Sequence, residues 1–354
     1  MLQTPVLIIG SLVILVVGLD KVGGWAEVER INDANMHLIR SASDAEFPWP
    51  GIVFGSFIIG FWYWCTDQYI VQRVLSAKGI KEARRGTMFA GYLKLLPVFI
   101  FLVPGMIAYA LNVKGIISYE SADQAFPTLV AELLPAGVKG IVIGGLVAAL
   151  MSSLASLFNS SATLFTIDFY KKFKPESSEK HLLKVGRIAT IVIVVLGLLW
   201  IPVMSLIADV LYEYLQSVQS LIAPGIAAVF LLGLCSKRIT PTAGFVGLVS
   251  GFVLGMTRLV LLPFKDDLTG SSFAWITTMN WLYYCILLFV VVVVIMIVVS
   301  MFTKQADEEQ LKGLTFSSLD KATMKEVAAG LDKWDYIHTA GIIGITAFIY
   351  YRFW

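Results

Sequence analysis

Residues 144–166 read GGLVAALMSSLASLFNSSATLFT, a run without a single charged side chain. A helix needs about 20 predominantly apolar residues to cross the roughly 30 Å of hydrocarbon in a bilayer. Strands of membrane barrels instead alternate apolar and polar residues over about 10 positions, and this run is too uniformly apolar for that pattern. The stretch therefore predicts a membrane-spanning helix.

The composition extends this prediction to the whole chain. Its 354 residues are 57% hydrophobic and 15% charged, with a mean hydropathy of +0.79, whereas a typical soluble domain is about 45–50% apolar and about 25% charged. We expect an all-α, polytopic membrane helix bundle of about nine spans. Apolar runs of suitable length lie near residues 5–19, 51–72, 87–111, 139–167, 185–207, 214–235, 240–263, 276–302 and 336–354.

Basic residues are concentrated in alternate loops. Residues 73–86, 171–187 and 237–238 are rich in Lys and Arg, and loops with such an excess usually stay in the cytoplasm. These three segments are therefore predicted to be cytoplasmic. We expect the protein in the plasma membrane, or in the inner membrane if it is bacterial. The three cysteines lie in or beside predicted spans and imply no disulfide framework.

One face of the 144–166 helix carries small and hydroxylated residues. Helical spacing aligns Ala149, Ser152, Ser153, Ser156, Ser160 and Thr163 along it. Such a stripe suits close packing of two helices, which we favour from Ser156 onward. Ser152 and Ser153, one turn after Ala149, also offer two hydroxyls and a backbone carbonyl, the neutral oxygens that a hard monovalent cation needs. For these three residues, sodium binding and helix packing are both open.

A second unusual stretch, FWYWCTDQYIVQR, covers residues 61–73. Tyr63 and Asp67 are four residues apart and share a helix face, with Trp64 beside them. Aromatic rings stack on the C–H faces of a sugar, and polar tips take its hydroxyls, so this wall suits a polyhydroxylated ligand. The alternative is an aromatic belt at the membrane surface. Asp67 either lines the site or has a structural role near the basic edge at Arg73.

Two further polar residues lie in predicted spans. Lys94 is about eight residues into its span, where a charge costs roughly 3 kcal/mol and therefore does not face lipid, so we expect it to line a cavity. Gln216 both donates and accepts hydrogen bonds, which suits either a ligand hydroxyl or a neighbouring helix. The sequence has no Walker motif, no His/Cys metal spacing and no catalytic triad, and we predict neither an enzyme nor a nucleic-acid binder.

Pro–Gly pairs mark candidate breaks in the helices. They occur at 50–51, 104–105 and 224–225, and freed backbone groups there need protein or water partners. Gly51, Gly55 and Gly60 predict an interruption just before the aromatic stretch. Discontinuous helices of this kind expose carbonyls and helix ends to solutes in many secondary transporters.

Several long motifs together resemble the sodium/solute symporter family, most closely its sodium/glucose cotransporters. The motifs are FPWPGIVFG at 47–55, WYWCTDQYIVQR at 62–73, GYLKLLPVFIFLVPGMI at 91–107, AALMSSLASLFNSSATLFTIDFY at 148–170 and LQSVQSLIAPGIAAVFLL at 215–232. The resemblance runs through essentially all of the chain. Because it involves ordered motifs, it is more specific than any single pattern above.

The resemblance implies a five-plus-five inverted-repeat fold like that of the leucine transporter. Residues 1–354 would then form a single transmembrane domain. Within it, residues 1–19 would end the fifth core helix, 51–235 would form the second inverted repeat, and 236–354 would form peripheral C-terminal helices. The family pattern has further helices before residue 1, so the first repeat would be missing from this chain.

The resemblance also implies roles for the polar residues. Tyr63 would be the aromatic inner gate beneath the sugar, with Trp64 as its neighbour. Lys94 and Gln216 would bind sugar hydroxyls. Ala149, Ser152 and Ser153 would form one half of a sodium site, through a carbonyl and two hydroxyls. Gly60 has no side chain where some sugar-binding relatives place an amide, which leaves the choice of hexose open.

The sequence thus predicts sodium-coupled symport of a glucose- or galactose-like sugar across the membrane by alternating access. Sodium would be the co-transported ion, and the partners would be the sugar, Na⁺ and the lipid bilayer. A second reading keeps the coupling but changes the solute to inositol, a nucleoside, a vitamin or an organic anion. A third reading is a truncated, inactive membrane fragment.

Overall fold

The structure, a computed structural model, describes residues 3–204, 210–319, 325 and 330–354. The chain divides into two compact units. The first comprises Met1–Leu38, Phe89–Ser205 and Gly344–Trp354, and the second comprises Ile39–Met88 and Leu206–Ile343.

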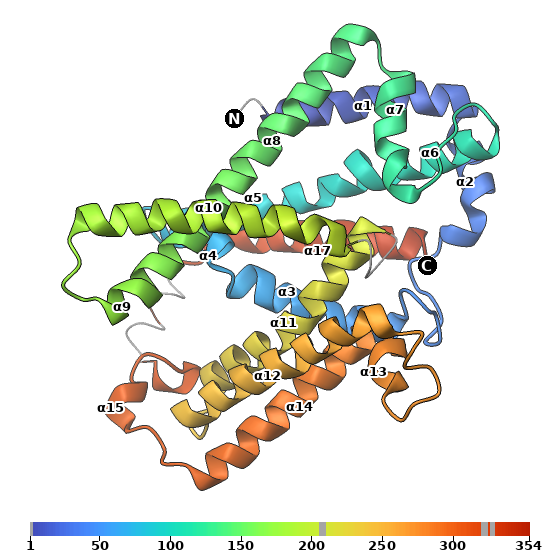
Figure 1. Cartoon of the computed structure of the whole chain (residues 1–354). Coiled ribbons are helices and arrows are strands. Elements are labelled where there is room, and N and C mark those ends of the chain that lie inside the picture. The colour runs from blue at the N-terminus through green and yellow to red at the C-terminus, as the bar shows by residue number, and fades with distance from the viewer. Residues whose placement is uncertain (1–2, 205–209, 320–324, 326–329) are drawn as a thin grey trace. The chain divides into compact units, whose positions relative to one another are not determined.

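The described residues are predominantly helical, as predicted (Figure 1). The α-helices are α1 (Gln3–Val22), α2 (Trp25–Asn32), α3 (Ser56–Cys65), α4 (Gln68–Leu75), α5 (Ile80–Pro97), α6 (Val103–Val113), α7 (Ala125–Leu133), α8 (Ala136–Thr163), α9 (Lys171–Phe173), α10 (Glu179–Met204), α11 (Leu211–Cys235), α12 (Pro241–Leu261), α13 (Ala274–Thr278), α14 (Trp281–Phe302), α15 (Glu308–Leu311) and α17 (Lys333–Arg352). Wider π-helical turns occupy Gly51–Gly55, Val98–Leu102 and Leu164–Tyr170, and short 3₁₀ turns occupy Asp33–Asn35, Ala122–Gln124, Leu262–Phe264 and Phe316–Ser318. One isolated bridge joins Arg40 and Pro48.

Seven helical segments among the described residues are long and apolar enough to cross a membrane. They are Pro5–Val22, Ile80–Val113, Ala136–Phe173, Glu179–Met204, Leu211–Cys235, Pro241–Phe264 and Trp281–Phe302, and they match seven of the predicted spans. The predicted span 51–72 contains a shorter apolar helix, Gly51–Cys65. The predicted span 336–354 forms α17, which is not among the seven. Residues 205–207 of the predicted span 185–207 lie outside the described residues.

In the first unit, α1 packs against α6 and α8. The apolar contact includes Ile14 of α1, Ile107 and Leu111 of α6, and Val142 of α8, which are all almost completely buried. Gly10 and Gly18 of α1 allow this close approach, since a Cβ at Gly10 would come 2.2 Å from Val142 and one at Gly18 would come 2.7 Å from Ile107. The first half of α8 is thus packed against α1.

A polar cluster ties α1, α2 and α6 together at one end of this packing. The helix α1 ends where Gly23 and Gly24 adopt positive φ, which leaves carbonyls without helical partners. Lys114, just after α6, donates 2.6 Å to the Val22 carbonyl and lies 3.0 Å from the Glu27 carboxylate. Arg30 pairs with the same carboxylate at 2.8 Å. Hydrogen bonds from Arg30 and then Lys114 lower the pKa of Glu27 from 4.5 to about 2.

We expect the contribution of Glu27 to stability to depend on pH. Because its pKa is lowered in the folded protein, the contribution is complete above about pH 4.5 and is lost as the pH falls toward about 2. Thermal unfolding of the wild type and of Glu27→Gln should therefore differ at pH 6 and converge at low pH. The control is Glu132→Gln, an exposed carboxylate without an ion pair among the described residues. A wild-type advantage that stays constant down to pH 2 would contradict the assignment.

In the second unit, α11, α12 and α14 lie side by side (Figure 1). The contact between α11 and α12 depends on two glycines in α12. A Cβ at Gly255 would lie 2.2 Å from the Leu221 carbonyl oxygen, and one at Gly251 would lie 2.7 Å from the Cα of Gly225. Small residues four apart are a common way for membrane helices to bring their backbones together. The α11–α12 contact is therefore a backbone-to-backbone contact.

Substitution of a glycine that touches the neighbouring backbone should lower the stability of the protein. We expect Gly255→Ala to lower the unfolding free energy by about 1–3 kcal/mol, because a backbone oxygen cannot move aside without shifting the helix. The matched control is Gly233→Ala in α11, where a Cβ would meet nothing within 4 Å. That variant should be neutral or stabilised by up to about 1 kcal/mol. Equal melting temperatures for the two alanine variants in detergent would refute the close approach.

The helix α12 also carries a buried cation that the sequence analysis overlooked. Arg258 is 3% exposed and donates a 2.6 Å hydrogen bond to the Met279 carbonyl. Its guanidinium lies 4.2 Å from the centre of the Tyr284 ring, an attractive arrangement of a cation over an aromatic face. These contacts connect the last turn of α12 to Met279, between α13 and α14, and to the first turn of α14.

Candidate functional site

The aromatic stretch lies on α3, directly after the π-helical turn Gly51–Gly55. Trp62 packs on an apolar cluster that includes Ile59 and Ala227. Tyr63 is half-buried, and its ring meets that of Trp64 edge-on at 5.2 Å between centroids. Trp64 is 42% exposed. The two rings therefore form one perpendicular pair with an accessible indole.

The helix is interrupted after these aromatics. The glycines led us to expect a break before them, but the chain stays helical from Gly51 to Cys65 and leaves the helix at Thr66 and Asp67. Asp67 has extended backbone angles, and its carboxylate accepts a 2.8 Å hydrogen bond from the Tyr69 amide. This is the geometry of an N-cap, which satisfies an amide that the new helix α4 leaves unpaired.

Asp67 therefore has a structural role, one of the two alternatives that the sequence left open. Thr66 closes the other side of the break, since its hydroxyl donates 2.7 Å to the Trp62 carbonyl. Beyond the cap, the Arg73 guanidinium lies 4.1 Å from the centre of the Tyr69 ring. The Asp67 carboxylate, the Thr66 hydroxyl and the Arg73–Tyr69 pair thus stabilise the chain on both sides of the break.

The capping role of Asp67 can be tested with a substitution that removes its charge but keeps its hydrogen-bond acceptor. Asn caps helices about as well as Asp, whereas Ala does not cap and costs about 0.5–2 kcal/mol. We expect Asp67→Asn to retain the melting temperature of the wild type and Asp67→Ala to lose stability by that amount. If Asp67→Asn were as damaging as Asp67→Ala, the negative charge rather than the cap would be the essential feature.

Gln216 lies on α11, which packs against α3 in the second unit. Its side-chain amide is half-buried and donates a 3.3 Å hydrogen bond to the Tyr212 hydroxyl, one turn earlier in the same helix. The amide oxygen can still accept a bond from a ligand. Tyr63, Trp64 and Gln216 thus belong to two helices in contact.

The predicted sodium ligands lie on α8 in the first unit. Ser152 and Ser153 are exposed, and Ala149 is partly buried. Further along the stripe, the Ser156 hydroxyl donates to the Ser152 carbonyl at 3.1 Å. The hydroxyl of Thr163 does the same to its own helix, and Ser160 is buried. The packing role favoured from Ser156 onward stays a prediction; Ser160 is buried, whereas Thr163 is exposed.

Lys94 is exposed in α5 and also belongs to the first unit. The predicted site residues thus form two sets, Lys94 with the α8 residues and Tyr63 and Trp64 with Gln216. Their assignment to a sodium site and a sugar site stays a prediction.

The model of the sodium:solute symporter family matches residues 1–251 of this chain. The chain belongs to this family. The match includes every residue of the predicted sugar and sodium sites. The resemblance inferred from the motifs is therefore confirmed.

Individual relatives give the same result. The chain is 37% identical to human sodium/glucose cotransporter 4, in an alignment that covers 89% of this chain and 52% of the relative. It is 36% identical to human sodium/myo-inositol cotransporter 2, over 92% of this chain and 54% of the relative. This family member thus spans about half the length of the curated relatives it matches.

A solved structure shares the fold. It is described as the substrate-bound outward-open state of a Na⁺-coupled sialic acid symporter, and it aligns with a TM-score of 0.65 at 20% identity. The alignment covers 86% of this chain and 62% of the other. The helical membrane fold expected from the sequence is that of a sodium-coupled symporter.

Proposed function

We propose that the protein carrying this chain is a sodium-coupled symporter of a sugar, working by alternating access. The observation that carries the proposal is 37% identity to a sodium/glucose cotransporter over 89% of the chain. The aromatic and hydroxyl-bearing residues predicted for the site all lie in the matched part. Sodium is the proposed co-transported ion, and the sugar is the proposed solute.

The sodium half of the mechanism rests on α8. The Ala149 carbonyl and the hydroxyls of Ser152 and Ser153 supply neutral oxygens to the ion. The exposure of both serines supports this role, because a ligand must reach them, whereas Ser156 already donates to its own helix. Bound sodium favours the arrangement that accepts sugar.

The sugar half rests on rings and polar tips. Trp64, with an accessible indole edge-on to Tyr63, offers a surface for the C–H face of the solute. Gln216 and Lys94 donate to its hydroxyls. The helix break at Thr66 and Asp67 follows directly after the aromatics, and Tyr63 next to it is the proposed gate.

Sodium coupling supplies enough free energy for accumulation. One charge that crosses a potential of 100 mV releases about 2.3 kcal/mol. Because about 1.4 kcal/mol corresponds to a factor of ten, the potential alone would concentrate a neutral sugar roughly fifty-fold. The proposed transport therefore requires no ATP.

The two halves can be separated by substitution in the whole protein, reconstituted in vesicles with labelled glucose and galactose. Ser153→Ala should raise the sodium concentration for half-maximal uptake about tenfold, while Ser156→Ala on the same face should leave it unchanged. Lys94→Ala should raise the apparent KM for sugar about tenfold at saturating sodium. Wild-type sodium and sugar curves for both Ser153→Ala and Lys94→Ala would refute the assignments.

A cyclic polyol is the second candidate solute, because the identity to the sodium/myo-inositol cotransporter is 36%. Both solutes present a ring of hydroxyls to the same residues. Competition of myo-inositol, glucose and galactose against sodium-driven uptake distinguishes them by their inhibition constants. Nucleosides, vitamins and organic anions belong in the same panel. If none of these solutes is taken up under a sodium gradient, sodium-coupled transport of this group of solutes is refuted.

A further inference from the structure

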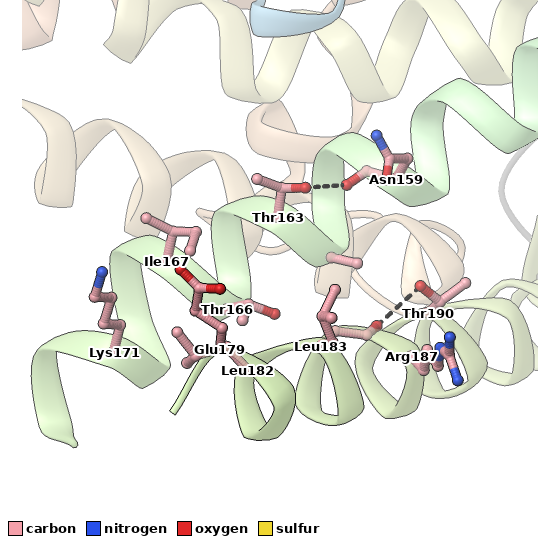
Figure 2. A pocket seen from close by; sticks show the side chains of 12 residues that line it. Asn159, Thr163, Thr166, Ile167, Lys171, Glu179, Leu182, Leu183, Arg187 and Thr190 are labelled. Carbon is pink, nitrogen blue, oxygen red and sulfur yellow. Dashed lines mark hydrogen bonds between the residues drawn. The ribbon is translucent and has the colours of Figure 1, made fainter. Parts of the chain in front are cut away.

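A cleft of about 540 Å³ lies between the end of α8 and the start of α10, within the first unit. Its lining comes from the chain around Thr163–Lys171 on one side and from Glu179–Thr190 on the other. Figure 2 shows Thr166 between the two helices, with Lys171 and Glu179 toward one end and Arg187 toward the other. The sequence predicted a cytoplasmic loop at 171–187 and no binding site here.

The floor of the cleft has an unsatisfied donor. Thr166 is 5% exposed, and its hydroxyl is buried without a hydrogen-bond partner among the described residues. Such a group is costly unless something bonds to it. Thr163 and Thr190 differ, because their hydroxyls donate to the carbonyls of Asn159 and Gly186 (Figure 2). Thr166 is therefore the threonine of the lining whose hydroxyl has no partner among the described residues.

The charges that line the cleft favour an anion. Lys171 and Arg187 carry two positive charges against the one negative charge of Glu179. None of the three forms an ion pair with another described residue. Arginine binds phosphate through a planar fork of donors, and the Thr166 hydroxyl adds a further donor.

The position of the cleft relative to the membrane favours a lipid over a soluble anion. Glu179 begins the apolar helix Glu179–Met204, and Arg187 lies about two turns further into it. Ile167, Leu182 and Leu183 also line the cleft and make part of its surface apolar. A ligand here would need a charged group close to hydrocarbon and a polar group toward the loop. Basic pockets between membrane helices on the cytoplasmic side hold anionic lipid headgroups in this way.

We propose that this cleft binds the headgroup of an anionic glycerophospholipid from the cytoplasmic leaflet. The phosphodiester lies between Arg187 and the Thr166 hydroxyl, and the hydroxylated headgroup extends toward Glu179 and Lys171. This inference does not depend on which solute the protein transports.

The test is calorimetric titration of the purified whole protein in detergent with dioctanoyl phosphatidylglycerol. Dioctanoyl phosphatidylcholine and inorganic phosphate serve as comparison ligands. We expect saturable binding of phosphatidylglycerol, with at least tenfold weaker binding of either comparison ligand. Equal binding of phosphatidylcholine would exclude recognition of the anion, and equal binding of inorganic phosphate would make the cleft a site for a soluble anion. No saturable binding would also overturn the proposal.

Variants then assign the binding to the cleft. Arg187→Gln should weaken binding of phosphatidylglycerol about tenfold, and Thr166→Val, which removes only the hydroxyl, should weaken it several-fold. Glu179→Gln should tighten it, because it removes the one negative charge of the lining. The matched control is Lys184→Gln, which removes a positive charge from α10 outside the lining. Equal losses in Arg187→Gln and Lys184→Gln would indicate attraction to the whole basic loop and would overturn the proposal.

Discussion

Backbone hydrogen bonding without water constrains every part of this chain. In hydrocarbon an unpaired amide or carbonyl costs several kcal/mol, so the apolar segments are helical and each helix start needs a local substitute. Asp67 supplies it for α4, Thr240 for α12 through the Ala243 amide, and Asn280 for α14 through the Leu282 amide. Some polar side chains in the apolar sequence therefore form hydrogen bonds to the backbone. Only the polar side chains that do not form such bonds are candidates for binding solutes.

This distinction narrows the candidate site. Asp67, Ser156 and Thr163 each bond to backbone atoms of their own segment. Ser152 and Ser153 remain exposed on the same helix as the latter two, which is what a ligand-binding hydroxyl requires. The same reasoning singles out Thr166, whose hydroxyl has no backbone acceptor in the part of the chain that the structure describes. One helix segment, Ala136–Phe173, thus carries the proposed sodium ligands near its middle and the proposed lipid cleft near its end.

Several close helix contacts in this protein depend on glycines, which have no side chain to separate the helices. Gly251 and Gly255 bring the α11 and α12 backbones together, while Gly10 and Gly18 admit side chains of α8 and α6 against α1. Where the chain turns at the membrane surface, ionic contacts take over, as with Lys114 between Val22 and Glu27. Close backbone contacts at glycines lie inside the apolar segments, and this ion pair lies at their ends. Both arrangements suit a chain whose apolar segments have no water to bond to.

The sequence alone determined the helical class, most span positions and the family, because hydropathy over about 20 residues and long ordered motifs are local properties. It also nominated the site residues, from Tyr63 to Gln216, through those motifs. Tertiary structure decided that Asp67 is a cap and that Ser156 turns inward to its own helix, since both depend on where a helix stops and which carbonyl is near. It likewise decided which glycines touch a partner helix: Gly233 and Gly255 look alike in hydropathy, and only the neighbouring backbone distinguishes them.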